Sequence, residues 1–130
     1  MPAPCAFDST VVRVVPRVER GEFLNAGVIV WCLAQDYLAA RVALDVARLR
    51  ALDPSADIDA ISAHLAAVPR ICAGDLAAGP VARLPPKERF HWLVAPRSTV
   101  IQTSPVHAGR AELPDAALAR LFKTLVESGT

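Results

Sequence analysis

Residues 20–31, RGEFLNAGVIVW, lead a charged turn directly into an apolar run. Gly21 permits the positive φ of a tight turn, and Asn25 is one of the few residues whose side chain bonds neighbouring backbone there. Gly27 allows another backbone or a bulky side chain to approach the run closely. We therefore predict a buried strand over residues 26–33, with Asn25 and Gly27 marking its beginning.

Two further strands are predicted on either side of this run. Residues 9–17, STVVRVVPR, are rich in β-branched residues and reach Pro16, which cannot continue a central ladder. Residues 37–44, YLAARVAL, follow after a short turn. Because short connections favour antiparallel neighbours, the first half of the chain predicts a three-stranded antiparallel meander. The first two strands are apolar on both faces, which is typical of strands that are central or covered on both sides.

The apolar spacing then changes to that of helices. Proline residues and acidic residues near helix starts delimit them, and the predicted helices cover residues 46–54, 57–71, 87–94 and a last segment from Pro114 to near Gly129. A fourth strand is predicted over residues 98–106, STVIQTSPV. The fold class is therefore α+β: a meander plus a later fourth strand, with two or three helices packed on one face of the sheet. The length predicts a single domain over residues 1–130.

Composition excludes several classes of partner. The net charge is +1, with no basic or acidic block, so neither nucleic acid nor an anionic membrane is expected to bind. The longest apolar run, residues 26–34, is too short to span a bilayer. The three cysteines form no CxxC pair and the first residues do not resemble a signal peptide, which favours the reducing cytoplasm.

Motifs that carry catalysis are missing from the sequence. The histidines His64, His91 and His107 lack metal-ligand spacing, and His64 is interpreted as a boundary residue beside a helical stripe. Neither a phosphate-binding glycine loop nor a nucleophile elbow is found. We therefore expect no metal and no cofactor, and the missing motifs favour a protein without enzymatic activity over a small enzyme.

The polar residues around the opening stretch form the first candidate site. They are Arg13, Arg20, Glu22, Asn25 and Gly27. One interpretation is an internally satisfied corner, in which Glu22 pairs with Arg13 or Arg20. The other is a pocket for a polar ligand, favoured because alternation places Arg13 beside valines and a buried arginine needs a partner.

A second candidate site lies around the turn before the fourth strand. It is a candidate interaction surface made of Arg89, His91, Trp92, Arg97 and Ser98. Helical spacing turns Arg89 and His91 outward, and Arg97 has the geometry to hold a carboxylate or phosphate bidentately. We also predict that the two sites meet: the fourth strand or Trp92 packs over Gly27, and Arg13 pairs with Glu22.

The order of these residues resembles a known family. Arg13, Pro16, the Arg20–Glu22 turn, Asn25 and Gly27, followed by ERFHWLVAPRSTVIQTSPV at 88–106, are similar to the bacterial family called domain of unknown function 3037. Arg17 departs from this pattern, because an acid is usual there, and so does Ala26. The resemblance implies no established activity. It implies an association with proteins resembling HipA-type kinases, beside which such chains are often encoded.

Two functions follow as expectations. The first is a non-catalytic cytoplasmic interaction module, whose partner is a kinase-like protein or a second copy of the chain in a homodimer. The alternative is a small enzyme or binding protein for a polar or phosphorylated metabolite. In that case Arg13, Glu22, Asn25, Arg97 and Ser98 are expected to form one pocket.

Overall fold

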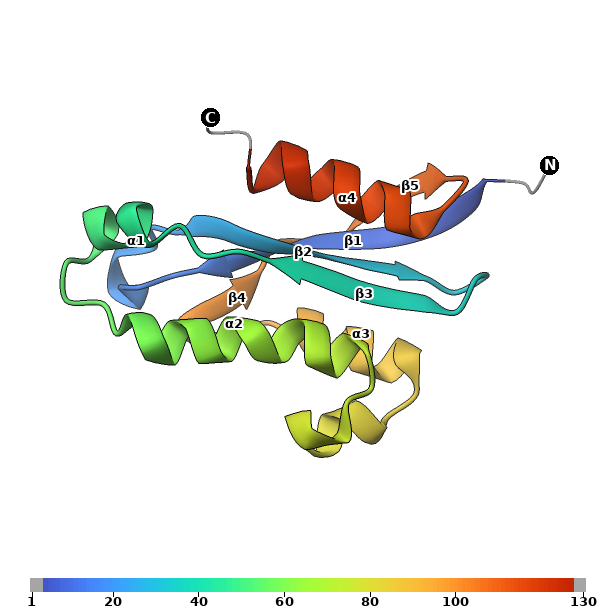
Figure 1. Ribbon diagram of the computed structural model, residues 1–130, viewed down its shortest axis with the longest axis horizontal. Coiled ribbons are helices and arrows are strands. Elements are labelled where there is room, and N and C mark those ends of the chain that lie inside the picture. The colour runs from blue at the N-terminus through green and yellow to red at the C-terminus, as the bar shows by residue number, and fades with distance from the viewer. Residues whose placement is uncertain (1–3, 128–130) are drawn as a thin grey trace.

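Helices cover both faces of an antiparallel sheet in the computed structural model, which describes residues 4–127 (Figure 1). The strands are β1 (Cys5–Val14), β2 (Leu24–Cys32), β3 (Tyr37–Val42), β4 (Ile101–Thr103) and β5 (His107–Ala111). The helices are α1 (Val46–Leu52), α2 (Ile58–Cys72), α3 (Pro86–Val94) and α4 (Pro114–Leu125). Short 3-10 turns lie at η1 (Val18–Arg20), η2 (Leu76–Ala78) and η3 (Pro80–Arg83). The predicted α+β class is confirmed.

Strand β1 lies at the centre of the sheet. The order is β3-β2-β1-β4, so the predicted meander is confirmed, and β5 also pairs with β1. β4 pairs with one end of β1, from Val12 to Val14, and β5 pairs with the other end, from Cys5 to Ser9. The fourth strand is therefore shorter than predicted, and β5 was not predicted.

The strand predicted over 98–106 ends at Thr103, and Ser104 forms the next bonds to β1: its amide donates to the Val11 carbonyl at 2.9 Å. Its hydroxyl lies 3.2 Å from the Thr10 hydroxyl and accepts a hydrogen bond from the Val11 amide at 2.9 Å. Pro105 follows and has no amide hydrogen for a ladder. The chain then resumes pairing with β1 as β5.

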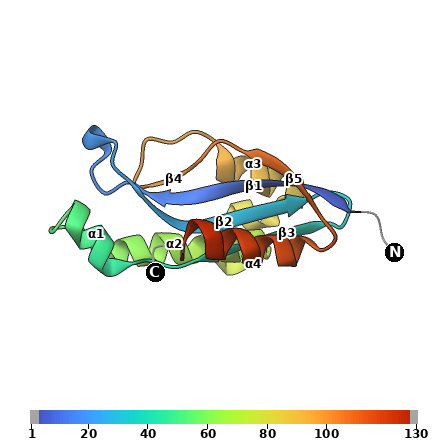
Figure 2. The ribbon, with the colours of Figure 1, turned by 90° about the horizontal axis from the view of Figure 1, so that it is seen from above.

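The core has two parts, one on each face of the sheet. Helices α2 and α3 pack against one face, which contributes Val12, Ile29 and Trp31. Helix α4 covers the other face, which contributes Val28 and Val30, and Figure 2 shows it alongside β2 and β3. The prediction that helices cover one face only was wrong. Because consecutive residues of β2 are fully buried, both faces of that strand need a cover.

A β-bulge explains the asparagine and glycine at the beginning of β2. Val12 pairs with Gly27, but Arg13 pairs with Asn25, so Ala26 is an extra residue. A Cβ atom on Gly27 would lie 2.7 Å from the Arg41 carbonyl oxygen and 3.3 Å from the Val12 Cβ. Glycine is needed there because the neighbouring strands approach closely. The prediction that β4 or Trp92 packs over Gly27 was wrong.

The bulge also changes which residues of β2 face α2. Before it, Leu24 and Ala26 belong to the core beneath α2 and α3; after it, Ile29 and Trp31 do. Without the extra residue, strict alternation would turn one of these pairs to the opposite face. Asn25 consequently points to the α4 side, where its Nδ2 donates to the Leu125 carbonyl at 3.1 Å.

Helix α2 begins where its capping residue predicts. The Asp57 carboxylate accepts a hydrogen bond from the Ala60 amide at 3.0 Å, which satisfies a free donor of the first turn. Ile61, Leu65 and Val68 then recur at helical spacing and are buried. None of the helices within residues 4–127 combines the length and apolar character that crossing a bilayer requires. The last helix ends at Leu125, and Gly129 lies outside the described residues.

Candidate functional site

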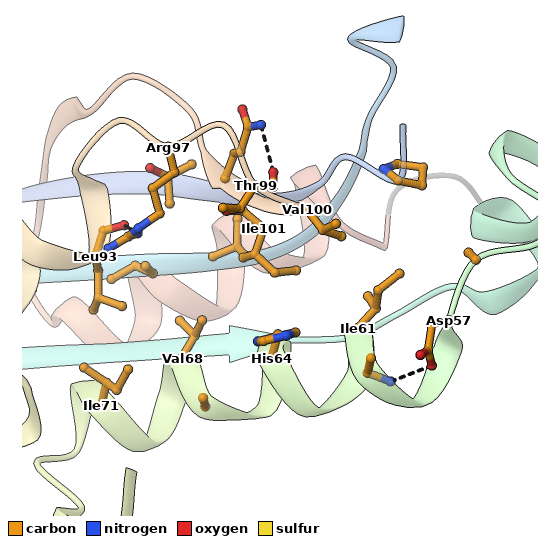
Figure 3. A pocket seen from close by; sticks show the side chains of 18 of the residues that line it. Asp57, Ile61, His64, Val68, Ile71, Leu93, Arg97, Thr99, Val100 and Ile101 are labelled. Carbon is orange, nitrogen blue, oxygen red and sulfur yellow. Dashed lines mark hydrogen bonds between the residues drawn. The ribbon is translucent and has the colours of Figure 1, made fainter. Parts of the chain in front are cut away.

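A cleft of about 620 Å³ separates α2 from residues 97–103 on the α2 face of the sheet (Figure 3). Its floor and walls are largely aliphatic, formed by Val12, Ile29, Ile61, Val68, Ile71, Leu93, Val100 and Ile101. Polar side chains lie among the same lining residues, and they include Asp57, His64, Arg97, Thr99, Gln102 and Thr103. The cleft combines an apolar interior with a few polar groups, as ligand-binding sites commonly do.

The cleft exists because α2 is centred over β3. Helix α2 contacts β3 more extensively than β4, and α3 packs against the end of α2 and against both of these strands. β4 is also only three residues long. The space above Val12 and Ile29 is therefore left between α2 and the segment that leads into β4.

Some polar side chains of the cleft form hydrogen bonds within the protein and others do not. The Thr99 hydroxyl donates to the Ile101 carbonyl at 3.0 Å, and the Gln102 amide donates to the Thr99 carbonyl at 2.9 Å. These bonds shape the turn before β4. The His64 ring, in contrast, forms no hydrogen bond or ion pair with residues 4–127, and it faces residues 99–101 across the cleft in Figure 3.

Arg97 holds Trp92 at the edge of the cleft. Its guanidinium carbon lies 4.3 Å from the Trp92 ring centroid, and its terminal nitrogens donate to the carbonyls of Leu93, at 2.9 Å, and Trp92. Burial lowers the pKa of Arg97, which stays charged at neutral pH because arginine titrates so high. Each terminal nitrogen donates one of its two N–H groups to a backbone carbonyl, so the expected bidentate hold of Arg97 on an external carboxylate stays a prediction.

Arg89 stabilises the fold through hydrogen bonds to backbone carbonyls and does not belong to an exposed interaction surface. It is half-buried, and one terminal nitrogen donates to the carbonyls of Ile71 and Cys72, at 3.0 and 2.6 Å. Its Nε donates to the Leu84 carbonyl at 2.9 Å. The expectation that Arg89 points outward was wrong, because the carbonyls at the end of α2 attract a cation.

The remaining members of the predicted interaction surface are exposed. His91 and Ser98 are exposed but do not line the cleft, and Trp92 is 42% exposed and does line it. The structure therefore brings Trp92 and Arg97 to the cleft and leaves His91 and Ser98 outside it.

In the first candidate site, Glu22 and Arg13 have different partners and do not contact each other as an ion pair. Glu22 pairs with Arg20, with 2.5 Å between the carboxylate oxygen and Nε, and both side chains are largely exposed. Arg20 is one of the two partners expected for Glu22, whereas the predicted pair of Arg13 and Glu22 was wrong. The guanidinium carbon of Arg13 instead lies 4.2 Å from the Phe23 ring centroid.

The single polar pocket considered as an alternative was also wrong. Arg13 and Asn25 line a smaller cavity on the α4 side of the sheet, whereas Arg97 lines the cleft on the α2 side. Glu22 and Ser98 line neither of the two. The two sequence blocks are neighbours in the sheet, since Arg13 pairs with both Asn25 and Gln102, but Arg13 and Arg97 line different cavities.

A comparison with protein-family models identifies the family of the chain. A model described as a protein of unknown function, DUF3037, matches residues 10–126. The chain belongs to the DUF3037 family. No curated protein and no solved structure matches it. The match covers both sequence blocks and all of the residues that line the cleft in this DUF3037 chain.

Metal-ligand clusters and cysteine thiols are two kinds of reactive group that the described part of the DUF3037 chain could offer. Within residues 4–127, no three side chains of His, Cys, Asp or Glu come together in a way that could hold a metal ion. All three cysteines are buried and unpaired. Burial raises the pKa of the Cys72 thiol to about 12, so this thiol is not a nucleophile at neutral pH.

Sequence reasoning did not place His64 in the cleft of this DUF3037 chain. The spacing of His64 from Ile61 and Val68 shows that it borders the buried stripe of α2, and the interpretation as a boundary residue used that signal. What the spacing does not show is that residues 99–101 lie opposite, because this depends on how far α2 extends over the sheet.

Proposed function

We propose that this DUF3037 chain is a non-catalytic interaction module of the cytoplasm that binds an apolar segment of a partner protein in the cleft between α2 and residues 97–103. The observation that carries the proposal is the cleft itself, with its aliphatic interior of about 620 Å³ and exposed tryptophan at its edge. An apolar cavity open to solvent on an otherwise packed core gains free energy when apolar side chains fill it.

Trp92 and Arg97 support a protein segment as the occupant. Tryptophan and arginine are enriched among residues that dominate binding energy at protein interfaces. Arg97 stacks on the Trp92 ring and is itself fixed by two backbone carbonyls. Because these side chains are already ordered, little side-chain entropy is lost when a partner contacts them.

The lining also limits what the segment carries. The side chains of Asp53, Asp57 and Arg97 give the cleft both signs of charge. A segment with two or three apolar side chains and no high net charge fits this lining better than a phosphorylated metabolite. We propose a kinase-like protein as the source of the segment, and a second copy of the chain as the alternative source.

Co-expression with the product of a neighbouring kinase-like gene, followed by size-exclusion chromatography, tests the proposal. Ala60 is exposed and lines the cleft, so Ala60→Arg should fill the opening and abolish co-elution. Ala66 is exposed on the same helix and does not line the cleft, so Ala66→Arg is the matched control and should co-elute.

The elution profiles distinguish the two proposed partners and test whether the cleft is the binding surface. Separate elution of the wild-type proteins at micromolar concentrations would exclude the kinase-like partner. Elution of the chain alone as a dimer, lost in Ala60→Arg and retained in Ala66→Arg, would instead identify a second copy as the occupant. Co-elution of Ala60→Arg at the wild-type level would show that the cleft is not the binding surface.

A further inference from the structure

A second cavity, of about 400 Å³, lies on the α4 face of the sheet. Strands β1 and β2 contribute Arg13 and Asn25, and the connection from β4 to β5 contributes Ser104 and His107. Leu121 and Leu125 of α4 form an aliphatic wall. No aspartate or glutamate is among the lining residues.

The Nε of Arg13 is buried without a hydrogen-bond acceptor among residues 4–127. Within the same residues the Arg13 side chain forms no ion pair and no hydrogen bond. Its stacking on Phe23 uses a face of the guanidinium and leaves the N–H groups at the edge unused. A guanidinium N–H that is buried without an acceptor has lost its bond to water and gained none in return, so it favours a ligand that supplies one.

The other polar groups of the cavity do not supply the missing acceptor. Thr10 and Ser104 bond each other, and the Ser9 hydroxyl points to the His107 carbonyl at 3.5 Å. Asn25 donates to the Leu125 carbonyl. The His107 ring forms no hydrogen bond with the described residues. The cavity therefore presents a guanidinium and an imidazole beside an aliphatic wall, and neither has a hydrogen-bond partner among residues 4–127.

We propose that this cavity binds a small organic carboxylate with a short aliphatic body. The carboxylate accepts hydrogen bonds from the edge of the Arg13 guanidinium, which matches its planar geometry. The aliphatic body packs against Leu121 and Leu125. The bulge at Ala26, opposite the step from Val12 to Arg13, and the hydrogen bond from Asn25 to α4 fix the positions of the two walls of the site.

This site is independent of the cleft of the proposed function. The cleft is lined by Val12 and Ile29, which face α2, whereas the cavity is lined by Val11 and Val28, which alternate to the other face. A ligand in the cavity and a protein segment in the cleft would occupy opposite sides of one sheet. Loss of either binding event leaves the other measurable.

Titration of the wild-type protein with butanoate and hexanoate tests the site directly. The Nε–H resonance of Arg13, observed by nitrogen-15 NMR, should shift and saturate, and hexanoate should bind more tightly than butanoate. The resonances of Arg20 and Arg97 should stay in place. The matched alcohols butanol and hexanol, which lack the charge, should leave Arg13 unchanged.

Arg13→Gln should weaken hexanoate binding by at least about tenfold, because the charge-assisted bonds are lost. Arg20→Gln, which removes a neighbouring exposed arginine, should bind as the wild type does. An unshifted Arg13 resonance in the wild type would overturn the proposal even if Arg13→Gln fails to fold. Saturation by inorganic phosphate but not by either carboxylate would overturn the assignment of the ligand class.

Discussion

The side-chain amide of Asn25 donates to the backbone carbonyl of Leu125 at 3.1 Å, joining the bulge in β2 to the end of α4. The carbonyls in the last turn of a helix have no partner within the helix, so this bond satisfies one of them. Asn25→Ala should lower the free energy of unfolding by about 1 kcal/mol. Hydrogen exchange should become faster in the last turn of α4 and stay unchanged in α2. Equal exchange rates in the variant and the wild type would show that the bond does not hold the helix.

Gly27→Ala should destabilise the fold by about 1–3 kcal/mol, because the added methyl group meets the backbone of β3. Chemical denaturation monitored by tryptophan fluorescence measures the change. Gly21→Asn is the control, because nothing lies within 4 Å of a Cβ atom there and asparagine tolerates the positive φ of 69°. The explanation of the bulge fails if both variants unfold at the same denaturant concentration as the wild type.

Glu22→Ala should lower the free energy of unfolding by at most about 1 kcal/mol, because its pair with Arg20 is exposed to solvent. A thermal melt measures the effect, and adding salt should reduce the difference from the wild type further. A loss of several kcal/mol would indicate that Glu22 neutralises a buried arginine after all.

Arg89→Ala should destabilise the protein by about 2–3 kcal/mol, because three carbonyls lose a charged donor. Arg83→Ala is the control, since Arg83 is exposed and forms no hydrogen bond with residues 4–127. Urea denaturation of both variants gives the comparison. Equal midpoints for the two would contradict a structural role for Arg89.

Cys72 should make the fold less stable as the pH rises above about 9. In the unfolded chain the thiol ionises near its ordinary pKa of 9.0, whereas burial raises the pKa in the folded chain to about 12. Between these values the unfolded state releases a proton that the folded state keeps, so stability falls with increasing pH. Denaturation curves at pH 8 and pH 10.5 measure the decline, and Cys72→Ala should show a shallower one. Identical slopes would mean that Cys72 is open to solvent.

The elements that the sequence predicts well are those with local signals. Helix α2 was predicted within one residue at each end, since Asp57 caps it and its apolar residues recur on one face. Strand β5 was not predicted, because its residues are mostly exposed and its partner strand lies far away in sequence. The pairing of β5 with β1 depends on the tertiary fold, and the sequence of residues 107–111 does not indicate it.

The candidate sites were predicted less well for a related reason. Arg89 and Arg97 bond backbone carbonyls, which every residue possesses, so the sequence carries no sign of those partners. The cleft depends on where α2 lies relative to β4, and Ile61 and Val68 have the same spacing whether or not a space remains above them. The residue types indicated which side chains are polar and near the sheet, but not on which face of the sheet each one lies.

The central position of β1 has a consequence for how the chain folds during synthesis. β1 pairs with β2 nearby, but its other edge is completed by residues about 94 positions later, as in the bond from Thr10 to Ser104. Contacts so distant in sequence slow folding, because the chain between them must be ordered first. Until β4, β5 and α4 have left the ribosome, the nascent meander exposes an unpaired strand edge and an uncovered apolar face. The first third of the chain is therefore the part whose aggregation a chaperone would have to prevent.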